Sequence, residues 1–324
     1  MSHIGVSYRR KDAADKVAGT TQFTDDVKPA GVLYAAVKTS TVAHGEIVSI
    51  DVTAAKAMPG VRGIFTGNDF PTRVGLYLGD KTALAHHRVR FYGEPVAAVV
   101  ADTERAAEAA VREVQVKYKE LPAVNSPREA LKPDAPIIHP KMESYTHIPA
   151  IFPEPGTNVG HRTKIRKGDA ESALKQADVV VEGSYSFPPG DHVAMEPRAA
   201  IAQVMSDGQI VIRTSTQSPY GVRGIMSATF GISPSKITVI APAVGGGFGG
   251  KAGIQLEPLA YLLSNALGGR PVRVTNTREM DLVSSPGAPG LQSRVKFGAK
   301  KDGTLVAAEI EYLFDSGGYA DYAV

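Results

Sequence analysis

The glycine-rich segment at residues 244–253, VGGGFGGKAG, places the tightest constraint on how this chain folds, because six of its ten residues lack a β-carbon. Glycine tolerates positive φ and lets other atoms approach the backbone closely. The flanking sequence KITVIAPAV reads as a strand, and IQLEPLAYLLSNALGG reads as a helix. The segment therefore predicts a loop between a strand and a helix at which the backbone meets another group at short range.

Two nucleotide-binding patterns fit this loop. Gly245, Gly250 and Lys251 fit the start of a P-loop. Gly245, Gly247 and Gly250 fit a dinucleotide fingerprint. A P-loop needs Ser or Thr after its lysine, where this chain has Ala252. The dinucleotide pattern needs an acidic residue after the next strand, but RPVRVTNT ends in Thr and Asn. Three readings stay open: a tight helix–sheet turn, a backbone cradle for a bulky polar cofactor, or a nucleotide site.

Composition narrows the class of protein. The 324 residues are 43% hydrophobic with a net charge of +3, and no basic stripe predicts a nucleic-acid partner. The chain has no cysteine, so it cannot itself hold a disulfide or a cysteine-ligated iron–sulfur cluster. The first residues lack the apolar core of a secretory signal, and no apolar run reaches membrane-spanning length. We therefore expect a cytoplasmic protein without a membrane partner.

The distribution of proline predicts the domain organisation. Eight of the 22 prolines fall between residues 122 and 155, which favours an extended connector. Residues 1–125 alternate strand and helix patterns and form a first α/β unit. Residues 126–163 are the Pro-rich connector, and residues 164–324 form a second unit of strands with two helices. The expected fold class is α+β.

Several stretches, taken in order, point to a known family. They include YGEPVAAVVADTERAAEAAVREVQVKYKELPAV, DHVAMEPRAAIA, the segment from STQSPYGVRG to GGGFGGKAG, and GGRPVRVTNTREMD. The chain resembles the molybdenum-cofactor subunit of the xanthine dehydrogenase and aldehyde oxidase family. The resemblance implies an N-terminal α/β hammerhead domain followed by the first part of a mixed α+β molybdopterin-binding domain.

The resemblance also implies a cofactor and a reaction. The cofactor is molybdopterin, in its cytosine dinucleotide form, and the reaction is hydroxylation with a water-derived oxygen. The amide of Gln217 is expected to donate to a molybdenum oxo group, while no residue of the chain ligates the metal directly. The expected cofactor-binding residues are Gln217, Gly246, Gly247, Phe248, Gly249 and Gly250.

The same resemblance predicts the substrate side of the site. His192 and Glu196 in HVAMEPRAA, together with Ala252, are expected to line the substrate pocket. Purine-hydroxylating members carry a glutamate at the position of Ala252, so a small heteroaromatic substrate is preferred, with an aldehyde or a purine still open. No residue matches the glutamate that acts as general base in the family; Glu196 and Glu257 are weak candidates.

The family's molybdenum subunit continues beyond the point where this sequence stops. We therefore expect either a fragment or a split subunit whose second molybdenum-domain chain carries the general-base glutamate. An iron–sulfur subunit and a flavin subunit with FAD complete the expected assembly. The alternatives are a non-catalytic scaffold subunit of the same assembly and a P-loop or Rossmann nucleotide-binding protein.

Overall fold

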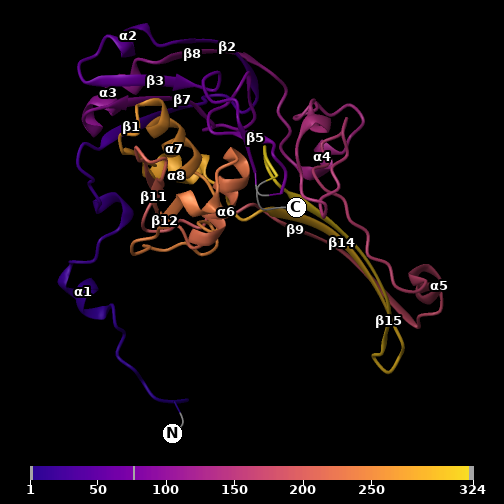
Figure 1. The fold of residues 1–324 in the computed structure, drawn as a ribbon. Coiled ribbons are helices and arrows are strands. Elements are labelled where there is room, and N and C mark those ends of the chain that lie inside the picture. The colour runs from indigo at the N-terminus through magenta and orange to yellow at the C-terminus, as the bar shows by residue number, and fades with distance from the viewer. Residues whose placement is uncertain (1–2, 76, 321–324) are drawn as a thin grey trace.

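The computed structural model describes residues 3–75 and 77–320; the ends of the predicted domain ranges, at residues 1–2 and 321–324, lie outside the described residues. Its centre is a seven-stranded sheet in the order β12-β11-β10-β13-β1-β7-β3 (Figure 1). The strands are β1 (Leu33–Thr39), β3 (Val61–Thr66), β7 (Pro95–Ala101), β10 (Ala199–Val204), β11 (Ile210–Thr214), β12 (Ile237–Ile240) and β13 (Val272–Thr275). Helices and strands occur in mixed order, which confirms the α+β class.

The central sheet contains strands from both predicted units. Strand β1 runs parallel to β13, with Leu33 opposite Val272, and β10 is antiparallel to β13 on its other side. The predicted domain boundaries stay a prediction, but the two units share one sheet and its core.

Strand β7 shows why this sheet is covered on both faces. Its sequence PVAAVVA is buried at every residue after the proline. Ala98 and Val100 pack into the larger core cluster, whereas Ala97 and Val99 pack into a second cluster on the other face. Alternate residues of a strand point to opposite faces, so a continuous apolar run predicts a strand with two buried sides.

Helices cover these two faces. Helix α3 (Glu104–Arg112) lies against β1 and β7, and α7 (Glu257–Ala266) lies against β10 and β13. The Thr103 hydroxyl accepts a hydrogen bond from the amide of Ala106, so Thr103 is the N-cap of α3. The remaining helices are α1 (Ala13–Ala18), α2 (Thr53–Lys56), α4 (Pro127–Ala130), α5 (Ala170–Lys175), α6 (Pro219–Phe230) and α8 (Arg278–Ser284). In the described parts of the chain, no helix has the length and apolar character needed to cross a membrane.

Three smaller sheets complete the fold. Strands β2 (Gly45–Asp51), β6 (Arg88–Val89) and β8 (Gln115–Glu120) form one, and β4 (Arg73–Val74) with β5 (Lys81–Thr82) forms another. The third consists of β9 (Val179–Phe187), β14 (Gly290–Ala299) and β15 (Leu305–Asp315), all antiparallel. These three long strands form a curved arm that projects away from the central sheet (Figure 1).

A buried polar cluster joins the segment that follows β15 to the first unit. The Tyr319 hydroxyl donates to the Glu94 carboxylate and accepts from Arg90 Nη1 at 3.1 Å. The ring Nε2 of His139, in the connector, lies 2.7 Å from the Gly318 carbonyl oxygen. Burial lowers the pKa of His139 to about 3, helped by the positive charge of Arg90. His139 is therefore neutral in the folded protein and donates through Nε2.

Candidate functional site

The glycine-rich loop follows β12 and reaches the start of α7. Gly246 and Gly249 have φ of 99° and 98°, which is the region where a side chain is strained. Phe248 between them adopts a φ of 54° without being glycine, and its side chain is 74% exposed. A residue held in the left-handed region, with a large apolar side chain in solvent, is typical of a functional loop.

The other glycines are needed because side chains of this chain come close to them. A β-carbon on Gly247 would lie 2.3 Å from Gln217 Oε1. A β-carbon on Gly250 would lie 2.6 Å from His192 Nδ1, and one on Gly245 would lie 2.6 Å from the Glu196 β-carbon. Three predicted site residues therefore converge on the loop, and part of its glycine content makes room for them.

The amide of Gln217 has a fixed orientation. Its Oε1 accepts hydrogen bonds from the backbone N–H of Gly249 at 3.1 Å and of Lys251 at 3.3 Å. Only the oxygen of a glutamine side chain can accept two such bonds, so the Nε2 position follows. Among the residues that the structure describes, nothing accepts a hydrogen bond from this Nε2, and it is left as a donor for a bound group.

The loop backbone offers further donors. The N–H groups of Gly246, Gly247 and Phe248 have no hydrogen-bond partner within residues 3–75 and 77–320. Consecutive free N–H groups in such a backbone form a concave surface that binds anions and other oxygen-rich groups. Together with Gln217, they form a donor set suited to a cofactor with several oxygen acceptors.

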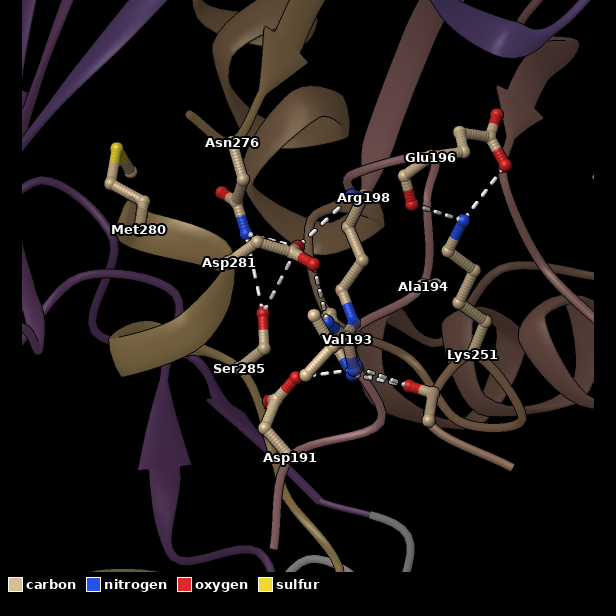
Figure 2. A network of polar contacts seen from close by, with 12 residues as sticks. Asp191, Val193, Ala194, Glu196, Arg198, Lys251, Asn276, Met280, Asp281 and Ser285 are labelled. Atoms are coloured by element: carbon tan, nitrogen blue, oxygen red, sulfur yellow. Dashed lines mark hydrogen bonds and ion pairs between the residues drawn. The ribbon is translucent and has the colours of Figure 1, made fainter. Parts of the chain in front are cut away.

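A buried ion pair holds one side of the loop. Lys251 Nζ lies 2.7 Å from Glu196 Oε2, and the two side chains are 1% and 9% exposed (Figure 2). Lys251 also donates to the Glu196 carbonyl at 2.8 Å, and the Gly245 N–H donates to Oε2 at 2.8 Å. Because Lys251 is buried in this pair, it cannot reach a phosphate, and the P-loop alternative is wrong.

The dinucleotide alternative is wrong for a different reason. The fingerprint requires its last glycine to open a helix directly, but α7 begins at Glu257, well after Gly250. The strand that follows, β13, carries no acidic residue at its end. The loop is therefore not positioned to hold a pyrophosphate and a ribose.

A second buried ion pair holds the other side of the loop. Arg198 Nη1 lies 3.1 Å from Asp281 Oδ2, with the side chains 6% and 1% exposed, and its Nη2 donates to the Gly250 carbonyl at 2.7 Å (Figure 2). Asp281 also accepts from the side-chain amide of Asn276 at 3.2 Å. Sequence reasoning missed both charged residues, although they lie in the stretches MEPR and REMD that carried the resemblance.

The segment that carries His192 is strained. Val193 has a φ of 44°, which is rare for a β-branched residue, and its N–H donates to Asp191 Oδ1 at 2.6 Å. His192 Nδ1 is buried without a hydrogen-bond partner among the described side chains and backbone. The His192 ring lies beside Gly249 and Gly250, and its place in a substrate pocket stays a prediction.

The remaining predicted residues occupy different environments. Ala252 is exposed next to the loop. Glu257 is 4% exposed and accepts from the Thr214 hydroxyl and the Gln255 N–H, both at 2.7 Å. Glu196 is committed to Lys251. Both carboxylates named as weak base candidates are therefore engaged in contacts within the chain.

Within the described residues, no group of three His, Asp or Glu side chains could hold a metal ion. The free donors of the loop fit a group that presents several oxygen acceptors. The fold and the site thus favour a domain that binds a cofactor, with backbone N–H groups and one side-chain amide as candidate donors.

Comparison with known proteins agrees with this class. Residues 151–324 match the family model described as a molybdopterin cofactor-binding domain. Residues 18–122 match the a/b hammerhead domain of aldehyde oxidase and xanthine dehydrogenase. The chain belongs to the molybdopterin-binding family of xanthine dehydrogenases and aldehyde oxidases.

Individual relatives show how much of such a protein this chain represents. It is 34% identical to a probable xanthine dehydrogenase subunit of Bacillus subtilis, over 96% of this chain and 40% of the relative. It is 32% identical to the nicotinate dehydrogenase large molybdopterin subunit of Eubacterium barkeri, over 98% of this chain and 72% of the relative. The aldehyde oxidoreductase structure of Desulfovibrio gigas superposes with a TM-score of 0.82 at 29% identity, over 96% of this chain and 34% of that one.

Proposed function

We propose that this chain forms part of a molybdopterin-dependent hydroxylase. The observation that carries the proposal is the fixed Gln217 amide, which leaves its Nε2 as a donor on a loop with three free N–H groups. When bound, the cofactor supplies oxygen transfer from water and accepts two electrons. Gln217 Nε2 and the free N–H groups of Gly246, Gly247 and Phe248 would hold and orient its oxygen atoms.

The residues around the loop have separate roles in this proposal. His192 and Ala252 line the substrate side in this proposal, because both lie next to the loop, with Ala252 exposed and His192 half-buried. Glu196, which is also expected in the substrate pocket, accepts a hydrogen bond from the Gly245 N–H and pairs with Lys251. Arg198 fixes the carbonyl of Gly250 from the opposite side. Rigid support of this kind keeps donors in place without reorganisation during the reaction.

We propose a small heteroaromatic substrate, with an aldehyde as the second possibility. Ala252 places a methyl group where a purine-orienting carboxylate would be expected, which disfavours xanthine. The support from relatives is that one is named a nicotinate dehydrogenase and another an aldehyde oxidoreductase. A flat aromatic ring can also pack against the exposed Phe248 side chain.

The general base and the electron acceptors are proposed to lie outside this sequence. Glu196 and Glu257 are already engaged, so a glutamate in the further part of the molybdenum subunit would deprotonate the reacting oxygen. Iron–sulfur clusters and FAD would lie on partner chains, since this chain has no cysteine. We propose the cytosine dinucleotide form of the cofactor on the resemblance alone.

The test is to isolate the complex through a tag on this chain and measure its molybdenum content and dye reduction. Nicotinate, an aromatic aldehyde and xanthine are compared as substrates. We expect about one molybdenum per chain and fastest turnover with nicotinate. A folded complex without molybdenum would refute the proposal and favour the scaffold alternative.

A further inference from the structure

We propose that one face of the arm formed by β9, β14 and β15 is the docking surface for the further part of the molybdenum subunit. This rests on the proposed function only for the identity of the partner. The surface itself follows from which residues the strand register places together and from what covers them.

The register sorts the arm into one apolar face and one polar face. Phe187 lies opposite Leu291, which lies opposite Phe314 on the third strand. Every second residue along each strand points to the same face as these three. No charged residue lies on it. Its members are Val179, Val181, Gly183, Tyr185, Phe187, Leu291, Ser293, Val295, Phe297, Ala299, Leu305, Ala308, Ile310, Tyr312 and Phe314.

The opposite face carries the charges. Glu182 pairs with Lys296, and Lys296 pairs with Glu309 across the three strands. In the next row Arg294 pairs with Glu311, and Arg294 forms an ion pair with Glu182. This is the usual composition of a face in contact with water.

Helices α4 and α5 nevertheless contact the polar face, while Arg294 and Glu311 on it remain 64% and 58% exposed. A β-carbon on Gly298, which belongs to this face, would lie 2.9 Å from Ala177 and 3.2 Å from Leu174 of α5. Glu311 on the same face lies 4.0 Å from Arg128 of α4. These two helices therefore lie on the charged side of the arm, whereas the aromatic side chains of the apolar side are exposed.

The exposed apolar area is large for a surface without a partner. Tyr185, Phe187, Tyr312 and Phe314 are 54–67% exposed. Aromatic side chains of this size contribute about 500 Å² of open surface together. Monomeric proteins rarely expose apolar patches beyond about 300–600 Å², and the aliphatic members of the face add to this figure.

The occupant is a polypeptide face without charges. Burying a charge against this surface would cost more than the contact returns, because the surface offers no countercharge. The relatives contain such a candidate, since this chain spans only 40% of the Bacillus subtilis protein and 34% of the Desulfovibrio gigas chain. The remainder of that subunit must pack against the matched part, and the arm presents the open apolar side for it.

The absence of cysteine makes a direct test possible. Tyr312→Cys places a single thiol on the apolar face, and Ser184→Cys places a matched thiol on the polar face, on the other edge strand. The tagged complex is labelled with a maleimide, and labelling of this chain is read by mass spectrometry. We expect the thiol at position 312 to react about tenfold more slowly than the thiol at 184, because access controls the rate.

A bifunctional thiol–amine reagent then identifies the neighbour. The expected cross-link joins position 312 to a segment that matches the further part of the family's molybdenum subunit, on the same or a separate polypeptide. Phe187→Cys repeats the test on the other edge strand, should the first variant fail to assemble. Equal labelling at 312 and 184, or a cross-link to a second copy of this chain, would overturn the inference.

The same preparation separates this inference from the proposed function. A molybdenum-containing, active complex with a freely reactive thiol at position 312 would leave the function standing and remove the docking surface. Slow labelling at position 312 with a cross-link to the expected segment, in a complex without molybdenum, would support the docking surface and refute the proposed function. Each result therefore bears on only one of the two proposals.

Discussion

Replacing Lys251 with methionine should destabilise the folded chain by about 3 kcal/mol. Removing one partner of a buried ion pair leaves an uncompensated charge and typically costs about 3–5 kcal/mol. Lys251 and Glu196 are 1% and 9% exposed, with Nζ and Oε2 at 2.7 Å. The Gly245 N–H still donates to the carboxylate at 2.8 Å after the substitution, so we expect the lower end of that range.

Urea unfolding measures this change, followed by far-ultraviolet circular dichroism because the chain has no tryptophan. Lys251→Met combined with Glu196→Gln should be more stable than Lys251→Met alone by about 1–2 kcal/mol, since no buried charge remains. Lys175→Met is the control. Lys175 and its ion-pair partner Glu171 have side chains that are 72% and 82% exposed, so this substitution should change the free energy of unfolding by less than about 0.5 kcal/mol. A loss below about 1 kcal/mol for Lys251→Met, or no recovery in the double variant, would refute the reasoning.

Three further predictions address the cofactor loop and the connector. Gln217→Ala should lower turnover of the assembled enzyme by about 10- to 1,000-fold with molybdenum content retained, and unchanged turnover would give Gln217 a purely structural role. Gly249→Val should abolish molybdenum binding, because a branched side chain at a φ of 98° would distort the loop and fill the space beside it. The chain should stay folded, because the only described atom within 4 Å of the β-carbon position is His192 Nε2, at 3.7 Å. Full molybdenum occupancy would contradict this. The pKa of about 3 at His139 predicts stability that is complete above about pH 6.5 and falls on acidification, by about 2 kcal/mol at pH 5, because the unfolded chain binds a proton that the folded chain does not. Urea midpoints of the unsubstituted chain and His139→Gln should therefore converge as the pH falls, and parallel curves would contradict the assignment.

Features set by neighbouring residues could be predicted from the sequence. Thr103 precedes a run of helix-forming residues, and its hydroxyl caps α3. The continuous apolar run of β7 is typical of a buried strand, and the glycine-rich segment predicts a close approach of the backbone. In each case, the physical cause lies within a few residues of the effect, so a local pattern carries it.

Features set by distant residues could not be predicted in this way. Nothing in the pattern around Leu33 indicates that β1 pairs with β13, whose residues lie far along the chain at Val272 and beyond. The contact of Arg198 with Asp281 is equally non-local, and either residue alone reads as an ordinary surface charge. The ion pair of Glu196 with Lys251 is likewise non-local, and spacing alone does not indicate it.

The composition of the loop explains why two buried ion pairs lie beside it. Replacing a buried ion pair by apolar residues is often neutral or stabilising, so stability alone does not account for these charges. Glycine has no side chain through which packing could hold the loop, and only its N–H and C=O groups remain as points of attachment. Glu196 accepts from the Gly245 N–H, and Arg198 donates to the Gly250 carbonyl. The charged residues thus fix a backbone that packing cannot fix, and Gln217 can orient its amide only because that backbone stays in place.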